Sequence, residues 1–241
     1  MRTGAVIQAR MSSSRLPGKV LRDLPEGSGV SVIEHVVERT RLARSLDEVI
    51  LATSDEADDD PIAVAAEALG VACYRGALED VVGRFVGAID AFALDRVVRI
   101  TADCPCVDPA IIDAAVALQA AEGADYTSNV RPRSYPKGLD VEVVEASVLR
   151  IIDAEAAEKP DREHVLTYVY LGHPERFRIA NLVAPAKFTD PDLRVTLDTR
   201  DDYEVLSRVF EYLGSRFDTA GLFEFFREHP GLRLTSEPLG R

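Results

Sequence analysis

The chain has 241 residues and a formal net charge of −13, with 46% hydrophobic and 29% charged residues. This composition is too apolar for disorder, and the acidic balance argues against a general nucleic-acid binder, whose surface must neutralise phosphates. No apolar run reaches the roughly 18 residues that a membrane span needs. The apolar start over residues 5–7 is also too short for a signal peptide. We therefore expect a cytoplasmic protein with neither a membrane nor a nucleic acid as partner.

Positive charge is concentrated at the start of this acidic chain. The first 22 residues contain no acidic residue and five cations, namely Arg2, Arg10, Arg15, Lys19 and Arg22. A cationic segment in an acidic protein favours an anionic ligand at that segment.

Short apolar runs alternate with helical periodicity in the first half of the chain. The predicted strands are 5–7, 49–52, 71–74 and 97–100, and the predicted helices are about 30–44, 61–69, 79–94 and 109–122. Two of these helices have clear end signals, which are Asp60, Pro61 and Gly70 for one and Asp108, Pro109 and Gly123 for the other. This order predicts βαβ units around a mostly parallel sheet.

The second half is less regular. The alternation over 139–143 predicts a half-buried strand, and helical patterns return near 145–158 and 162–172. The segments 177–183 and 193–197 are predicted as extended, and a helix over about 200–213 has Thr199 and Asp202 as a capping box and Gly214 as its stop. We expect a single α/β domain over 1–241 with an inserted antiparallel section.

The loop Ala9–Lys19 follows the first predicted strand directly. It combines three serines with the cations Arg10, Arg15 and Lys19. Ligands in open α/β sheets bind at the carboxyl ends of the strands, and a polyphosphate needs several donors and charge compensation at once. The loop lacks the GxxxxGK[ST] pattern of a P-loop. We interpret it as a phosphate-binding loop; a solvated basic loop is the alternative.

Two aspartates each end an apolar run. Asp103 follows the fourth strand, and Asp198 follows the extended segment 193–197. Mg²⁺ uses one or two carboxylates together with phosphate oxygens and water. Either aspartate alone is typical of a helix cap or turn, but the pair predicts metal ligands beside the phosphate loop.

Three cysteines do not form a disulfide framework. Cys104 and Cys106 resemble half of a metal site, but the four histidines are scattered along the chain. We interpret these two cysteines and Cys73 as buried or loop thiols.

Five segments together resemble a known family. These are Gln8–Leu21, Arg99–Pro105, Tyr135–Glu142, Arg162–Val165, and Thr196–Thr199 followed by Asp201–Tyr203. They are similar, in the same order over nearly the whole chain, to the CMP-sugar synthetases, which include the CMP-Kdo and acylneuraminate cytidylyltransferases. The pattern is most similar to the spore-coat polysaccharide biosynthesis type within that superfamily. The resemblance implies a Rossmann-like nucleotidyltransferase fold, with residues of about 125–190 inserted for acceptor binding and dimerisation.

The resemblance also implies roles for individual residues. The residues expected to bind the nucleotide are Arg10, Ser12, Ser13, Arg15, Lys19, Arg75 and Thr101. Catalysis is expected from Arg15, Lys19, Asp103 and Asp198, of which the two aspartates would bind Mg²⁺. The acceptor, a sugar or sugar acid, is expected to meet Asp140, Glu142, Arg162, Glu163 and His164. His164 is also a candidate proton acceptor, although a lone histidine in a helix is more often structural.

The implied reaction transfers CMP from CTP to an acceptor oxygen and releases pyrophosphate. We expect a homodimer, with the apolar run Val165–Leu171 contributing to the interface.

Three rival functions fit parts of the same pattern. The first is an A-type glycosyltransferase that uses a nucleotide-sugar. It would carry a DxD-type motif, which Asp58–Asp60 matches only formally because a turn and helix cap explain it. The second is CMP transfer to a non-sugar acceptor such as a phosphonate, and the third is a non-enzymatic nucleotide-binding scaffold.

Overall fold

Seven strands form one mixed sheet in the computed structural model, which describes residues 1–235. Their order across the sheet is β3-β2-β1-β4-β6-β5-β7. The strands are β1 (Thr3–Gln8), β2 (Glu48–Ser54), β3 (Ala72–Gly76), β4 (Arg96–Thr101), β5 (Tyr126–Ser128), β6 (Glu142–Glu145) and β7 (Ile179–Asn181). Neighbouring strands are parallel except around β6, which is antiparallel to both β4 and β5. The predicted α/β class with a mostly parallel sheet is confirmed.

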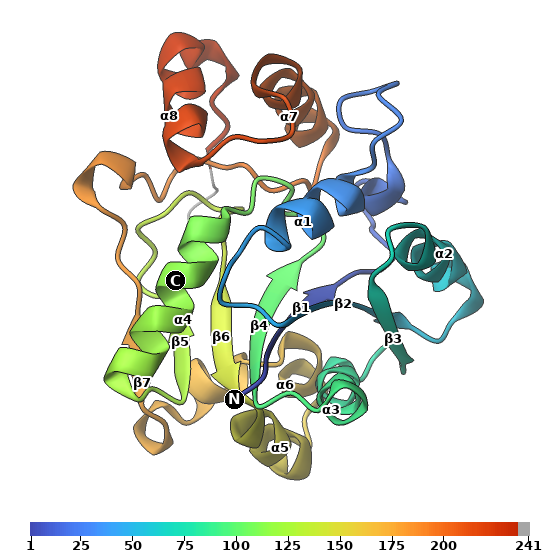
Figure 1. Cartoon of the computed structure of the whole chain (residues 1–241), viewed down its shortest axis with the longest axis vertical. Helices are drawn as coiled ribbons and strands as arrows, with labels where there is room; N and C mark the ends of the chain where they lie inside the picture. The colour runs from blue at the N-terminus through green and yellow to red at the C-terminus, as the bar shows by residue number, and fades with distance from the viewer. Residues whose placement is uncertain (236–241) are drawn as a thin grey trace.

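Helices cover both faces of this sheet (Figure 1). They are α1 (Val32–Thr40), α2 (Asp60–Ala68), α3 (Val81–Phe92), α4 (Pro109–Glu122), α5 (Ala146–Glu155), α6 (Lys159–His164), α7 (Arg200–Leu213) and α8 (Thr219–Glu228). One buried core lies between the sheet and α1, α2, α4, α7 and α8. The other lies between the sheet and α3, α5 and the segment after α6.

The four strands predicted for the first half are all present. Their apolar runs are continuous because both faces of the sheet are buried; Ile7 of β1 packs into the first core and Val6 into the second. The carboxyl ends of β1, β2, β3 and β4 point to one edge of the sheet, since these strands are parallel. The residues that follow them therefore meet there.

Two helix predictions need correction. Helix α2 begins at Asp60, one residue earlier than predicted, and the side chain of Asp59 at its N-cap position makes no capping hydrogen bond. The helix predicted over 162–172 is divided into α6 and a π-helical turn over Tyr168–Gly172. Between them Val165 has a φ of +53°, a conformation that a β-branched residue adopts only when its surroundings impose it.

Two strand predictions also need correction. The segment 193–197 is extended but forms no strand of the sheet; it makes only isolated bridges, from Leu193 to Thr235 and from Arg194 to Lys137. The strand expected over 139–143 is β6, which begins only at Glu142.

The capping box of Thr199 and Asp202 at the start of α7 is confirmed. Within residues 1–235, no helix is long and apolar enough to cross a membrane.

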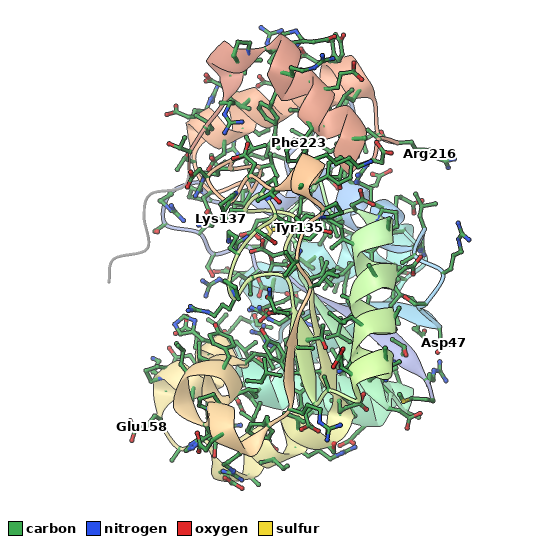
Figure 2. The ribbon with its side chains drawn as sticks, turned by 90° about the vertical axis from the view of Figure 1, so that its left-hand side faces the viewer. Asp47, Tyr135, Lys137, Glu158, Arg216 and Phe223 are labelled. Atoms are coloured by element: carbon green, nitrogen blue, oxygen red, sulfur yellow. The ribbon has the colours of Figure 1, made fainter. Side chains whose placement is uncertain are left out.

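Residues 125–190 add β5, β6, β7, α5 and α6 to the molecule. Figure 2 shows Glu158, between α5 and α6, at the opposite end of the molecule from Phe223 of α8. The segment with Tyr135 and Lys137 lies between these ends, close to the C-terminal helices (Figure 2).

Candidate active site

The loop after β1 is closed by a backbone hydrogen bond. The N–H of Gly18 donates to the carbonyl of Met11 at 3.1 Å. Gly18 has a φ of +67°, a conformation that glycine adopts without strain. It leads into a 3₁₀ turn over Lys19–Leu21, in which the side chain of Lys19 is buried. The loop therefore directs one lysine inward, while Ser12 and Ser14 are exposed and Ser13 is half-buried.

This loop forms one wall of a cavity of about 230 Å³ at the carboxyl ends of β1 and β4. The lining residues are Gln8, Ala9, Arg10, Ser12, Ser13, Ser14, Arg15, Lys19, Val20, Thr101, Ala102, Asp103 and Asp198. Eight of the nine residues predicted from sequence to bind nucleotide or metal are among them, and Arg75 is the exception. The side chains of Arg10 and Arg15 are more than half exposed. They can therefore meet a phosphate that enters from solvent, while Arg15 also pairs with Asp198 at 3.1 Å.

Lys19 joins the two candidate metal ligands. Its Nζ lies 2.8 Å from Asp103 Oδ2 and 2.9 Å from Asp198 Oδ1, and it donates to the carbonyl of Leu197 at 2.7 Å. All three ammonium protons thus have acceptors. The two carboxylates, 95 residues apart in sequence, consequently converge on a single cationic point.

A close backbone approach places Asp198. The extended segment 193–197 hydrogen bonds to Lys137, since Lys137 donates to the Leu193 carbonyl at 2.9 Å and Val195 donates to the Lys137 carbonyl at 2.7 Å. Gly138 has a φ of +108°, and a Cβ at this position would come within 2.5 Å of the carbonyl carbon of Val195. Only glycine allows this contact. The Tyr135–Glu142 motif therefore helps to position the second aspartate.

Charge around Asp198 favours its ionised form. Burial acts to raise the pKa of Asp198, but Lys19, Arg15 and Arg194 outweigh it, and the pKa lies below the ordinary value. Arg194 donates to Asp198 at 2.8 Å and to Asp202 at 2.7 Å. Burial likewise acts to lower the pKa of Lys19, and the two aspartates reverse that effect, so the pKa is raised. Both groups are charged at neutral pH.

The donor set fits a divalent cation. Two carboxylates already converge on the Lys19 ammonium, so this point of the cavity favours positive charge. Mg²⁺ characteristically takes one or two carboxylates and completes its shell with phosphate oxygens and water. Asp103 and Asp198 supply that number of carboxylates beside the phosphate loop.

A second cavity of about 460 Å³ adjoins the first, and Thr101 lines both. It is lined by Arg99, Thr101, Val130, Arg131, Pro132, Arg133, Asp140, Glu142 and Tyr170. Three of these residues are arginines and two are acidic, so the cavity has an excess of positive charge in a chain whose net charge is −13. It can therefore hold a small polar molecule beside the first cavity.

A buried network forms the base of this second cavity. Arg99 of β4 pairs with Glu142 of β6, and Tyr126 donates to the same carboxylate at 2.6 Å. Arg99 also donates to the side-chain oxygen of Gln8 at 3.1 Å. Because Gln8 lines the first cavity, these bonds connect the two cavities through side chains held in fixed positions.

The arginines of the second cavity differ in their partners. Arg133 makes a bidentate pair with Asp140, at 2.5 and 2.9 Å. Arg131 instead lies over the ring of Tyr170, 4.6 Å from its centroid. No carboxylate pairs with Arg131 among the described residues. Its guanidinium is thus available to an anionic group of a ligand.

Arg75 is engaged away from both cavities. It donates to the carbonyls of Ser54 and Glu56, each at 2.9 Å, and pairs with Asp60 at 2.7 Å. These bonds hold the loop between β2 and α2. Arg75, expected after the third strand, is the penultimate residue of β3 and lines neither cavity.

Three residues predicted to meet the acceptor also lie outside the second cavity. Arg162 is bound to Asp80 and Asp153 and so fixes α6 against α3 and α5. Glu163 faces Arg10 of the phosphate loop at 4.0 Å, and His164 is exposed. The chain turns at Val165, directly after α6, which directs Tyr170 rather than these side chains toward the cavity.

The apolar run Val165–Leu171 is mostly buried within the chain itself. Val165, Leu166, Tyr168 and Val169 belong to the second core, and only Leu171 is largely exposed. The run is apolar because it packs against its own sheet, so it offers little surface to a partner. Burial raises the pKa of Cys104 well above its ordinary value and that of Cys106 to about 12, so both thiols favour the protonated form.

Four residues that line the second cavity with a charged or aromatic side chain were not predicted from sequence. Arg99 interrupts an apolar strand, and a charge in a buried strand was the sequence signal that could have identified it. Arg131 and Arg133 flank Pro132. Tyr170 had no such signal, because its place depends on the turn at Val165.

The sheet, the cation-lined pocket at its carboxyl edge and the paired aspartates define a nucleotidyltransferase. The comparisons with known proteins make the class specific. The chain belongs to the cytidylyltransferase family, whose model matches residues 5–220. It is thus a CTP-dependent nucleotidyltransferase and an enzyme.

The similarity extends over nearly the whole chain. The spore coat polysaccharide biosynthesis protein SpsF of Bacillus subtilis is 36% identical over 217 residues, which is 89% of each chain. The structure of a cytidylyltransferase from Leptospira borgpetersenii superposes with a TM-score of 0.90 at 29% identity and covers both chains fully. The suspected relation to CMP-sugar synthetases of the spore-coat type is confirmed.

More distant structures share the fold. A CMP:2-keto-3-deoxy-manno-octonic acid synthetase complexed with CTP has a TM-score of 0.64 at 19% identity, with 88% of this chain and all of that chain covered. The Mycobacterium tuberculosis protein Rv0371c, in complex with manganese, has a TM-score of 0.58 at 18% identity, with 86% and 97% covered.

Proposed function

We propose that this enzyme transfers CMP from CTP to a hydroxyl of a sugar-type acceptor in polysaccharide or glycoconjugate biosynthesis, with Mg²⁺ as cofactor. The observation that carries the proposal is the meeting of two cavities at Thr101, one lined by the phosphate loop and the other by arginines and a tyrosine. Two such neighbouring pockets are what a transfer between a nucleotide and a second molecule requires.

The nucleotide occupies the first cavity in this proposal. Arg10 and Arg15 bind the phosphates from the solvent side, and Ser12 and Ser13 supply hydroxyl and backbone donors. Lys19 stabilises the negative charge that develops on the departing pyrophosphate, because its ammonium is held at the inner end of the same pocket.

Asp103 and Asp198 hold Mg²⁺ in this proposal. The ion, when bound, neutralises phosphate charge and makes the α-phosphorus more open to attack. Lys19 contacts both carboxylates, and Arg194 holds Asp198 from its other oxygen, so the two carboxylates keep their positions relative to one another.

The acceptor occupies the second cavity. Its attacking hydroxyl oxygen reaches the α-phosphorus near Thr101 and forms the new oxygen–phosphorus bond as its proton passes to solvent water. The bond from the α-phosphorus to the pyrophosphate oxygen breaks, and pyrophosphate leaves. Arg131 suits a carboxylate on the acceptor, and the Tyr170 ring beneath it supports the guanidinium. Asp140 and Glu142 act through the arginines that they orient. The protein supplies positions and charge rather than a covalent intermediate.

The test is pyrophosphate release in the presence of Mg²⁺. The protein is incubated with each nucleoside triphosphate and with a panel of sugar acids, amino sugars and phosphonates. Release that requires both CTP and a sugar-type acceptor supports the proposal. Release only with a phosphonate points to a non-sugar acceptor. Turnover of a nucleotide-sugar without pyrophosphate would establish a glycosyltransferase instead.

A homodimer is the assembly that the family resemblance implies, and we retain it as a prediction. Light scattering during size-exclusion chromatography at micromolar concentration measures the mass directly. A mass of one chain would exclude the dimer.

A further inference from the structure

The Ser54–Asp60 loop, which runs from the last residue of β2 to the first residue of α2, is hydrogen bonded to the phosphate loop. The carboxylate of Asp59 accepts from the backbone N–H of Met11 at 2.7 Å. Met11 lies one residue after Arg10 and is also the residue whose carbonyl closes the loop onto Gly18. Asp59 therefore holds the phosphate loop at its hinge, from a segment outside the nucleotide cavity.

The other oxygen of this carboxylate is also occupied. Asp59 Oδ2 accepts from the hydroxyl of Ser54 at 2.5 Å and from the Ser54 N–H at 3.2 Å. The side chain is buried, with 3% of the residue exposed. A carboxylate that accepts three hydrogen bonds in a buried position keeps one orientation, so its bond to Met11 is fixed in direction.

Arg75 holds the same loop from the opposite side. Its guanidinium donates to the carbonyls of Ser54 and Glu56 and pairs with Asp60. These contacts lie on both sides of Asp59 in sequence. The chain of contacts thus runs from β3 through Arg75 to the Ser54–Asp60 loop, and from Asp59 to Met11 of the phosphate loop.

We propose that Asp59 is a positioning residue for the triphosphate, and that Arg75 supports it by bracing the Ser54–Asp60 loop. The inference rests on the proposed function of the first cavity as the triphosphate site. It gives Arg75 a task different from reading the nucleobase. It also explains why only the middle carboxylate of Asp58–Asp60 is buried, since that one reaches the phosphate loop.

The two roles of Arg75 predict different ligand dependence. A brace of the phosphate loop affects every ligand that carries the phosphates, whereas a base reader affects CTP and spares inorganic pyrophosphate. Calorimetric titration with Mg²⁺ and either CTP or pyrophosphate distinguishes them without an acceptor. We expect Asp59→Asn to raise the Kd of both ligands by about tenfold and Arg75→Ala to raise both Kd values by about threefold. Arg75→Lys should bind both ligands more nearly as the parent enzyme does.

Asp58→Asn is the matched control, because Asp58 is the exposed neighbour in the same acidic triplet. It should bind CTP and pyrophosphate as the parent enzyme does. Equal binding by folded Asp59→Asn and the parent enzyme would overturn the proposal, and so would a loss of CTP affinity in Arg75→Ala with pyrophosphate binding unchanged.

Hydrogen exchange gives a readout that survives a loss of stability. Burial lowers the pKa of Arg84, and the charge of Asp59 opposes that effect, so Asp59→Asn also removes a compensating charge. In the ligand-free protein, the Met11 amide should exchange faster in Asp59→Asn and in Arg75→Ala than in Asp58→Asn. An unchanged exchange rate of the Met11 amide would overturn the proposal that Asp59 holds the phosphate loop. If the parent enzyme fails to bind CTP, the proposed function is wrong. The exchange rate of the Met11 amide still tests whether Asp59 holds the phosphate loop.

Discussion

The two cavities of this enzyme are built in different ways. The first lies at the carboxyl ends of parallel strands, and most of its charged groups come from one continuous loop and from residues that directly follow a strand. The second is assembled from β4, the antiparallel strand β6, the loop around Pro132 and the turn after Val165. In the function that we propose, the first cavity serves the nucleotide chemistry, and the second is where specificity for an acceptor can change without disturbing that chemistry.

The strongest test of this division is the removal of a charge at the first cavity. Asp103→Asn should lower kcat by at least ~100-fold, because it weakens a charge contact made in the transition state. Steady-state pyrophosphate release at saturating Mg²⁺ measures the effect. The exposed carboxylate Asp201 provides the control, and Asp201→Asn should keep normal turnover. Near-normal turnover in folded Asp103→Asn would remove the metal assignment.

Replacement of the cation between the two aspartates should have the next largest effect. Lys19→Met removes an ammonium that contacts both carboxylates, and we expect kcat/KM for CTP to fall by about 30-fold, or about 2 kcal/mol. The variant should also gain more thermal stability from added Mg²⁺ than the parent enzyme, since the carboxylates then lack a neutralising partner. A melting temperature that responds equally to Mg²⁺ in both proteins would contradict this interpretation.

A change in the second cavity should affect the acceptor alone. Arg131→Ala should raise KM for an acidic acceptor by about tenfold, the value of one hydrogen bond to a charged group, with KM for CTP unchanged. Arg150 is an exposed arginine of α5 paired with Asp90, and Arg150→Ala should change neither constant. An equal rise in both KM values for Arg131→Ala would show that the cavities are not separate.

The smallest expected effect is on stability in acid. The pKa values of Asp198 and Asp202 are lowered in the folded protein despite burial, by Lys19 and by Arg194 respectively. The folded state thus binds fewer protons than the unfolded chain. The contribution of these two carboxylates to the free energy of unfolding should be complete above about pH 4, the ordinary carboxylate pKa. It should be lost as the pH falls through the lowered pKa values. Urea unfolding between about pH 2.5 and 6 measures this slope, which Asp198→Asn should reduce.

The sequence predicted the first cavity well because its signals are local. Arg10, Arg15 and Lys19 lie within one loop, and Asp103 follows an apolar strand whose direction the βαβ pattern already implies. Asp198 was found for a partly wrong reason, since the segment before it is extended but lies outside the sheet.

The second cavity could not be predicted to the same extent. Its residues are brought together by long-range pairing of β4 with β6 and by the turn at Val165, and neither follows from periodicity. Helical spacing favoured a continuous helix over 162–172, and the family resemblance alone implied that Arg162 and His164 meet the acceptor. Tertiary packing of the second core overrode that local preference.

Gly138 lines neither cavity, but a side chain at this position would displace Asp198. Any side chain there would collide with the backbone at Val195 and would separate the two segments that hold Asp198 near Lys19. A harmful variant of this enzyme could thus arise 60 residues away from the carboxylate that it disables. In such a variant every catalytic side chain would still be present. The defect would be the displacement of the segment 193–197 from Lys137 and Gly138.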